Sequence, residues 1–319
     1  MDKKDLKIVF FGTPEFAVES LRRLTDGGFN IAAVVTMPDK PAGRGHKLFQ
    51  SPVKEFALKH NMRILQPTNL KDNAFLEELR SLDANLFIVI AFRMLPATVW
   101  QMPALGTFNL HASLLPRYRG AAPINWAIIN GDTKTGVTTF FLKHEIDTGD
   151  VISQESIEIL PEDDAGSVHD KLMTLGAELT MKTVEDILND NVKTIPQSEM
   201  SGGIDPTAAP KIFRETCHID WNRSAEEIHN LVRGLSPYPS AWTDILFSDG
   251  IKVNVKILKT TLSERKTSEA GKLTIENGRL FAGCKDGSVE IVTLRPEGKR
   301  VMAASDYLRG LRSEPVSAI

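Results

Sequence analysis

The chain has 319 residues, of which 42% are hydrophobic and 25% are charged, and its formal net charge is −3. This composition is ordinary for a soluble globular protein, and the length favours two domains over one. The longest apolar run, Leu86–Phe92, is too short to cross a bilayer, and the polar N-terminus lacks the apolar stretch of a signal peptide. We therefore expect a cytoplasmic protein, and the whole-chain charge does not suggest a nucleic-acid binder.

The charge is unevenly spread along the chain. Residues 207–319 carry 17 Lys and Arg against 14 Asp and Glu, a net +3, and the remainder carries 21 against 27, a net −6. A mildly basic second half suits an anionic partner, although many neutral folds show as much by chance. Cys217 and Cys284 stand in no metal-ligand spacing, so we expect two free thiols and no metal.

The first half alternates short β-rich runs with helical patterns. Lys7–Phe11 predicts a buried strand that ends at a turn, where Thr13 could cap the helix that Pro14 begins. Further strands are expected at 31–36, 64–65, 86–91, 107–110 and 136–142, and further helices from Ser51, at 73–82 and at 122–129. This alternation predicts an α/β fold with a Rossmann-like, doubly wound and mostly parallel sheet.

The second half has a different pattern of predicted elements. A long amphipathic helix at 167–188 precedes a segment rich in Pro and Gly. After it we expect a helix at 225–235 and strands at 241–247, 252–259, 271–275, 279–282 and 289–294, with Asn-Gly and Asp-Gly turns between them. About five such strands fit a small OB-like β-barrel. The predicted division is a first domain at 1–190, a linker at 191–210 and a C-terminal domain at 211–319.

Asn109 and His111 form the strongest chemical signal. Residues two apart lie on the same side of a strand, and this strand ends where open α/β sheets bind their ligands. Asp147 follows in a Gly-containing turn that can aim its carboxylate inward, whereas Asp150 is interpreted as structural. An amide that donates to a carbonyl oxygen, an imidazole that carries a proton and an acid that orients it are the parts of an acyl-transfer site. The alternative is that both residues have structural roles only, with Asn109 satisfying backbone groups at the end of the strand and His111 packed in the interior.

No Ser or Cys nucleophile motif accompanies these residues. The incoming substrate is therefore expected to be the nucleophile itself. The turn at Gly12 is neither a Gly-x-Gly-x-x-Gly loop nor a Walker motif, so a nucleotide site there is not expected.

Two loops add to this picture. The Gly- and Pro-rich insertion that begins at Pro38 carries four basic residues against one acid and suits a phosphodiester backbone, unless it is simply solvated. Those basic residues are Lys40, Arg44, His46 and Lys47. Arg93 lies in the apolar segment Ala91–Pro96, where it could pair with an acid or offer its neighbours' backbone to a flat heteroaromatic ligand.

The segment Asn109-x-His111-x-Ser113-Leu-Leu-Pro116, together with Asp147-x-Gly149, resembles the folate-dependent formyltransferases. The likeness extends from about residue 7 to about residue 310 and is greatest for the members that formylate methionyl initiator tRNA. It is carried by six further segments: Phe11–Ala17, Pro38–Gly45, Ser51–Lys54, Arg119–Ile124, Ile219–Trp221 and Pro296–Lys299.

This resemblance implies a Rossmann-like formyl-transfer domain, a linker and an OB-type barrel that helps to hold tRNA. It implies 10-formyltetrahydrofolate as the donor, the α-amine of methionyl initiator tRNA as the acceptor, and N-formylmethionyl-tRNA for translation initiation as the product. Asn109, His111 and Asp147 match the catalytic trio of the family. The expected folate-binding residues are Ser113, Leu114, Leu115 and Pro116, with Phe92, Arg93, Met94 and Leu95. The basic loop would bind tRNA, with Arg44 reaching the acceptor stem. We expect a monomer.

One segment departs from the pattern. Ala91–Pro96 stands where many bacterial members have a longer Tyr- and Gly-rich stretch, and it is closer to the glycinamide ribonucleotide formyltransferases. Three alternatives remain open at this point. They are a formyltransferase for a small amine such as an amino-sugar nucleotide, a 10-formyltetrahydrofolate hydrolase, and a tRNA- or folate-binding module without catalysis.

Overall fold

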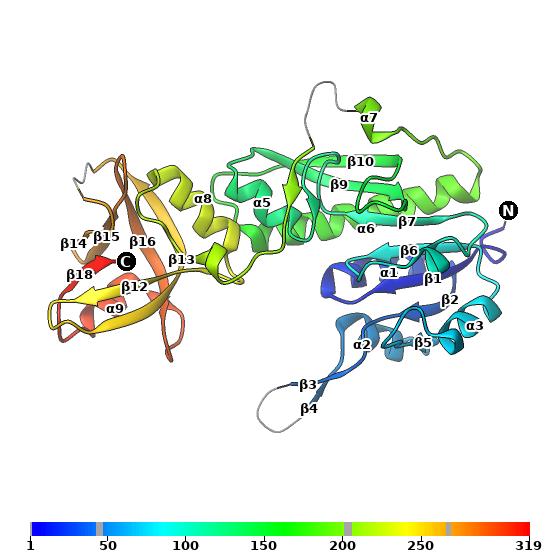
Figure 1. The fold of residues 1–319 in the computed structure, drawn as a ribbon, viewed down its shortest axis with the longest axis horizontal. Helices are drawn as coiled ribbons and strands as arrows, with labels where there is room; N and C mark the ends of the chain where they lie inside the picture. Colours follow the sequence, from blue (N-terminus) through cyan, green and yellow to red (C-terminus); the bar gives the residue numbers. More distant parts are fainter. Residues whose placement is uncertain (1, 43–46, 201–205, 266–268) are drawn as a thin grey trace. The chain divides into compact units, whose positions relative to one another are not determined.

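The computed structural model describes residues 2–42, 47–200, 206–265 and 269–319 (Figure 1). The chain divides into two compact units. The first comprises Met1–Gly120, Gly136–Ile157 and His169–Ala208, and the second comprises Ala121–Thr135, Glu158–Val168 and Ala209–Ile319. Most of the expected linker, up to Ala208, therefore belongs to the first unit.

The first unit is built on a seven-stranded sheet with the strand order β10-β9-β7-β6-β1-β2-β5. The strands are β1 (Lys7–Gly12), β2 (Asn30–Val35), β5 (Ile64–Leu65), β6 (Leu86–Ile90), β7 (Thr107–His111), β9 (Lys134–Phe141) and β10 (Val151–Glu158). The pairs β1–β2, β1–β6, β2–β5 and β6–β7 are parallel, whereas β9 runs antiparallel to β7. The predicted Rossmann-like, mostly parallel sheet is confirmed.

Helices cover both faces of this sheet because its central strands are apolar on both sides. All five residues of β6 are buried, as is expected for a parallel strand between two helical layers. On one face, Val9 and Phe11 share a buried cluster with α3 (Asn73–Ser81) and α4 (Ala97–Trp100). On the other, α6 (Ala165–Leu188) approaches so closely that a Cβ on Gly176 would come within 2.7 Å of the Leu110 side chain.

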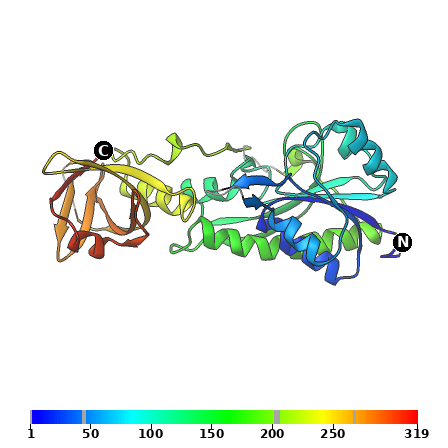
Figure 2. The same ribbon diagram turned by 90° about the horizontal axis from the view of Figure 1, so that it is seen from below.

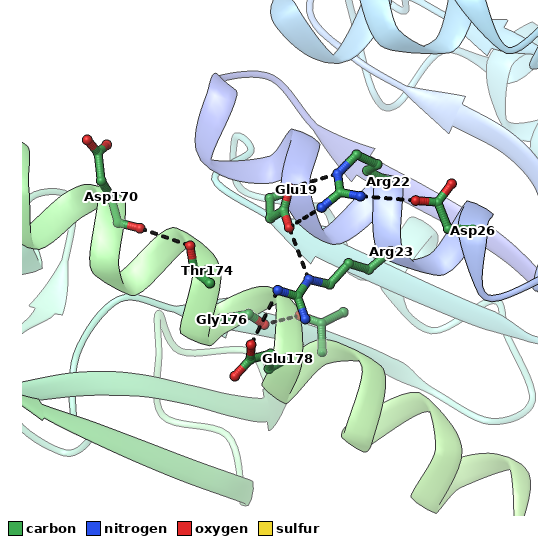
Figure 3. A network of polar contacts seen from close by, with 9 residues as sticks. Glu19, Arg22, Arg23, Asp26, Asp170, Thr174, Gly176 and Glu178 are labelled. Atoms are coloured by element: carbon green, nitrogen blue, oxygen red, sulfur yellow. Dashed lines mark hydrogen bonds and ion pairs between the residues drawn. The ribbon is translucent and has the colours of Figure 1, made fainter.

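The helix α1 (Glu15–Asp26) lies beside α6, and charged side chains join the two (Figure 3). Arg23 donates to Glu19 at 3.0 Å within α1 and to Glu178 of α6 at 3.3 Å. A hydrogen bond from Arg22 is the largest influence that lowers the pKa of Glu19, although partial burial opposes it. Exposed ion pairs contribute at most about 1 kcal/mol each, so the apolar packing of both helices on the sheet is the greater source of stability.

Local sequence signals explain the start of α2 but not the start of α1. Ser51 caps α2 (Pro52–Lys59), since its hydroxyl accepts from the Lys54 backbone N–H at 3.1 Å. The expected cap by Thr13 is wrong, because Pro14 occupies the N-cap position without any side-chain cap and the Thr13 hydroxyl is buried without a described partner. The tight approach of Gly12 to α1 decides the geometry there, with Ala17 Cβ 2.8 Å from a Cβ placed on that glycine.

The basic insertion contains a hairpin that the sequence did not predict. Its strands are β3 (Lys40–Ala42) and β4 (Lys47–Phe49). Three other short elements belong to the loops and the expected linker: β8 (Arg119–Gly120), α7 (Gln197–Met200) and β11 (Ala208–Ala209), of which β8 and β11 pair.

The second unit is a nearly closed antiparallel barrel (Figure 2). Its strands are β12 (Ala241–Phe247), β13 (Lys252–Ser263), β14 (Leu273–Glu276), β15 (Arg279–Gly283), β16 (Ser288–Pro296), β17 (Met302–Ala303) and β18 (Pro315–Ala318). The Asn-Gly signal is confirmed, because Asn277 and Gly278 connect β14 to β15 with φ values of 52° and 74°. The predicted barrel is thus confirmed, with more strands than the expected five.

The C-terminal strand closes this barrel. β18 pairs with β12, and its Ala318 N–H also donates to the Gly271 carbonyl next to β14, at 2.7 Å. Gly271 permits this approach because its φ is +75° and a Cβ there would lie 2.4 Å from the Ala318 carbonyl oxygen.

Two helices complete the second unit. The helix α8 (Ala225–Leu235) buries Ile228, Val232 and Leu235 in the barrel core, and α9 (Ala304–Arg309) adds Ala304 and Tyr307. The helix α5 (Pro123–Ile129) packs against α8 in the same unit, with the Asn125 side chain donating to the Gly234 carbonyl at 2.7 Å. Among the described residues, no helix is both long and apolar enough to span a membrane.

Candidate active site

Asn109 and His111 come from the carboxyl end of β7. In register, Asn109 lies beside Val89 of β6 and Phe140 of β9, so both neighbouring strands hold it in place. Leu110 between them points to the face covered by α6, and the two polar side chains therefore share the opposite face. The Asn109 side chain is half-buried and forms no hydrogen bond with the described residues, which leaves its amide available to a substrate.

The His111 imidazole is buried, and one of its nitrogens is hydrogen-bonded to the protein backbone. Nε2 lies 2.8 Å from the carbonyl oxygen of Tyr118. A carbonyl can only accept, so Nε2 must carry a hydrogen in any protonation state that keeps this bond. The other nitrogen, Nδ1, lies 3.8 Å from Oδ2 of Asp147.

Asp147 lies in the loop between β9 and β10 with its backbone in the left-handed region, at φ +54°. Its Oδ2 accepts a hydrogen bond from the Gly120 N–H at 2.9 Å, which fixes the carboxylate beside the imidazole. Asp150 instead pairs with Lys143 at 2.6 Å. A Cβ on Gly149 would come within 1.6 Å of the Phe141 carbonyl oxygen, so only glycine lets this loop fold tightly against the end of β9.

Hydrogen bonds from within the protein fix the conformation of the segment Ser113–Pro116. The Ser113 hydroxyl is fully buried and donates to the Arg117 carbonyl at 2.7 Å, and the Ser113 carbonyl accepts from the Thr138 hydroxyl at 2.6 Å. Gln154 of β10 donates to the Leu115 carbonyl at 2.8 Å. The serine therefore shapes the loop, and any contact with a ligand would come from the other groups of the segment.

Phe92–Leu95 follows β6, next to the loop that follows β7, so the two segments expected to bind folate adjoin at one sheet edge. Arg93 pairs with no acid among the described residues: its guanidinium donates to the carbonyls of Thr68, at 2.9 Å, and Pro67. Burial lowers the pKa of Arg93. Leu95 is buried, whereas Met94 is 73% exposed. Of the two roles expected for Arg93, the described residues offer no acid to pair with it, and the presentation of its neighbours' backbone to a flat ligand stays a prediction.

Of the basic loop, Lys40 is exposed on β3 and Lys47 begins β4, while Arg44 and His46 lie outside the described residues. The base of this hairpin is anchored by a network that the sequence did not reveal. Lys54 donates to Asp39 at 2.6 Å and to Gln66 at 2.8 Å, and Gln66 also donates to Asp39 at 2.8 Å. The hydrogen bond from Lys54 is the main cause of the lowered pKa of Asp39.

The described residues contain no group of three or more His, Cys, Asp or Glu side chains placed to hold a metal ion. Cys217 and Cys284 are both buried free thiols. Burial raises the pKa of the Cys284 thiol to about 11. A low thiolate fraction follows, so this cysteine is a poor nucleophile at neutral pH.

Two family models match the chain: "Formyl transferase" over residues 6–184 and "Formyl transferase, C-terminal domain" over residues 211–312. The methionyl-tRNA formyltransferase of Bacteroides thetaiotaomicron is 53% identical over 318 residues, which cover 98% of each chain. That of Phocaeicola vulgatus is 55% identical over 317 residues, again 98% of each chain.

Solved structures share the fold at lower identity. WlaRD, a sugar 3N-formyltransferase crystallised with dTDP and 5-N-formyl-THF, superposes with a TM-score of 0.66 at 22% identity, covering 92% of this chain and 99% of that one. HypX from Aquifex aeolicus, in complex with tetrahydrofolic acid, gives a TM-score of 0.63 at 19% identity, covering 94% of this chain and 46% of that one. Given the identity and coverage of the bacterial relatives and the match of both family models, the chain belongs to the methionyl-tRNA formyltransferases, a family within the formyl transferases.

Proposed function

We propose that the protein transfers the formyl group of 10-formyltetrahydrofolate to the α-amine of methionyl initiator tRNA. The observation that carries this proposal is the grouping of three side chains at one end of β7: an Asn109 amide that bonds to no described residue, a buried His111 and the Asp147 carboxylate. The names of the bacterial relatives support the tRNA acceptor, and the folate derivatives bound in structures of the same fold support the donor class.

The hydrogen-bonding pattern supports a different role for each nitrogen of His111. Its Nε2–H is held by the Tyr118 carbonyl, so only Nδ1 can exchange a proton or donate to a reacting atom. Asp147, whose Oδ2 lies 3.8 Å from Nδ1, would orient the ring, and an Nδ1–H would donate to the formyl oxygen.

Reaction begins when the neutral amine nitrogen bonds to the formyl carbon. A free α-amino group has a pKa of about 7.7–8.0, so a substantial fraction is neutral near pH 8. Asn109 and His111 would stabilise the negative charge that develops on the carbonyl oxygen. Asp147 would accept the proton released by the amine through a water molecule. The oxyanion then re-forms the carbonyl, the bond from the formyl carbon to N10 breaks, and N10 would take up the proton that Asp147 accepted, through the same water, as tetrahydrofolate leaves.

Folate binding is proposed at the sheet edge where the loops after β6 and β7 adjoin. The contributors are Phe92, Arg93, Met94 and Leu95 on one side and Ser113, Leu114, Leu115 and Pro116 on the other. Because the side chains of Ser113 and Arg93 are held by backbone carbonyls, we expect these two residues to fix the shape of the loops. Ligand contacts then come from main-chain groups and from their apolar neighbours.

Two basic regions are proposed to hold the tRNA. The first is the β3–β4 loop with Lys40, Arg44, His46 and Lys47. The second lies on the barrel, where Trp242, Lys256 and Arg295 stand side by side in register across β12, β13 and β16. The Arg214 guanidinium lies 5.1 Å from the centre of the Trp242 ring. Lysine and arginine beside a half-buried tryptophan ring suit a nucleic-acid backbone and its bases.

The decisive experiment is formyl transfer from 10-formyltetrahydrofolate to methionyl initiator tRNA, with free methionine and a UDP-amino sugar as parallel acceptors. We expect product on the tRNA alone. Product on the sugar alone would leave the catalytic trio in place and remove the tRNA assignment. Loss of the formyl group without any acceptor would indicate a hydrolase instead.

We predict that Arg44→Ala raises the KM for methionyl-tRNA about tenfold, which is the size of one lost charge-assisted hydrogen bond. The KM for the folate should stay unchanged. The slope of log(kcat/KM) against log[salt] should fall by about one unit, because one phosphate contact is removed. Arg80→Ala, at an exposed arginine of α3, is the matched control. Equal kinetics for the two variants would contradict tRNA binding by the loop and favour the alternative that it is simply a solvated surface segment.

A further inference from the structure

Gln197 is a buried polar residue in the segment that the sequence marks as a linker. It lies on the short helix α7, and only 4% of its surface is exposed. Its Nε2 donates to the carbonyls of Asp147, at 2.8 Å, and Gly149, at 2.9 Å. Its Oε1 accepts from Nε of Arg119 at 3.0 Å and from Nη2 at 2.6 Å. Both donors and both lone pairs of the amide are therefore used.

These bonds close a ring around the Asp147 carboxylate. Gln197 holds the main chain of Asp147 on one side and the side chain of Arg119 on the other. The next residue, Gly120, donates its N–H to Asp147 Oδ2 at 2.9 Å. The carboxylate and its own backbone are thus fixed to the same short strand, β8. The left-handed backbone of Asp147 is a conformation that needs such support.

Thr207 makes the corresponding contacts for His111. Its hydroxyl accepts from the Tyr118 N–H at 2.9 Å, and its carbonyl accepts from the Arg119 N–H, also at 2.9 Å. The carbonyl of Tyr118 is the group that accepts from His111 Nε2. Thr207 therefore fixes the peptide that orients the imidazole. All of these residues belong to the first unit.

We propose that Gln197 and Thr207 are positioning residues for formyl transfer, which we name the linker brace. The inference rests on the proposed roles of Asp147 and His111. In this view the expected linker does more than connect two domains, because it sets the distance between the acid and the imidazole. Neither residue of the brace touches the reacting atoms, so each acts through the residue that it holds.

Kinetics separate this role from general stabilisation. Gln197→Ala should lower kcat roughly 10- to 100-fold, because misplacement of a catalytic group by about 1 Å costs this much, and both KM values should stay within about twofold. Gln197→Glu keeps the acceptor for Arg119 but places an oxygen against two carbonyls, and it should lower kcat at least as much. Glu199→Ala, at an exposed residue of the same helix, is the matched control and should behave as the parent.

Thr207 offers an independent pair of variants. Thr207→Val loses the hydroxyl that accepts from Tyr118 and should lower kcat about tenfold, whereas Thr207→Ser retains the hydroxyl and should restore turnover. This pair tests the brace even if the Gln197 variants do not fold. Equal turnover of the valine and serine variants would contradict the part assigned to Thr207.

A double-mutant cycle shows whether Gln197 acts through Asp147. In an Asp147→Asn background, Gln197→Ala should change kcat by less than about threefold. The same factor in both backgrounds would overturn the inference, as would parent-like turnover of both Gln197 variants. Parent-like turnover of Asp147→Asn alone is a different outcome, since it would refute the proposed role of the acid itself.

Discussion

Asn109→Ala is expected to lower kcat about 100- to 1000-fold with little change in either KM, because it removes a donor to the oxyanion that forms in the transition state. The amide forms no hydrogen bond with the described residues, so its loss leaves no internal group unpaired. The urea midpoint should therefore stay close to that of the parent. This combination of lost turnover and kept stability distinguishes a catalytic amide from a structural one.

His111→Ala should lower kcat by at least as much, and here stability should also fall. The buried Tyr118 carbonyl loses its partner, which costs about 1–3 kcal/mol. Steady-state rates with both substrates, read beside urea unfolding, measure the two effects separately. His60→Ala and Asn191→Ala, both at exposed positions of the first unit, are matched controls. Parent-like turnover of Asn109→Ala or His111→Ala would end the assignment of this site.

Gly149→Ala is the second substitution with a large expected effect. A Cβ would lie 1.6 Å from the Phe141 carbonyl oxygen and 2.9 Å from the Phe140 ring, and the backbone oxygen cannot move aside as a flexible side chain could. The loop must shift as a whole, at a cost of about 3 kcal/mol. Because the same loop carries Asp147, kcat should also fall by about 100-fold.

The comparison for Gly149 is Gly287→Ala in the barrel. A Cβ there meets only ordinary contacts, the nearest at 3.8 Å, so its urea midpoint and kcat should match those of the parent. If Gly149→Ala were as stable and as active as Gly287→Ala, the loop would have space for a Cβ at position 149. That result would contradict the close contact between this loop and the end of β9.

The sequence alone was sufficient where the physics is local. Alternating and continuous apolar runs identified the strands of both sheets, because burial of one or both faces of a strand determines which neighbouring residues are apolar. The spacing of Asn109 and His111 placed them on one side of a strand, since side chains alternate along it. The Asn277-Gly278 turn joined β14 to β15 because both residues tolerate a positive φ.

Residues far apart in the chain escaped this reasoning. Gln197 bonds to residues 50 and 78 positions away, and no local pattern marks such a partner. The Ser113 hydroxyl was expected near folate, but the turn that follows brings the Arg117 carbonyl to it. Thr13 was expected to cap a helix, and close packing of the strand and the helix around Gly12 decided otherwise.

By itself, then, the sequence determined the order of the elements, the two fold classes and the residue types of the site, because these depend on contacts between near neighbours. Only the tertiary structure decided which nitrogen of His111 faces Asp147, how Gln197 and Thr207 hold both, and how β18 closes the barrel against Gly271. Each of these depends on hydrogen bonds between distant segments, and such bonds form only once the apolar core has brought the segments together.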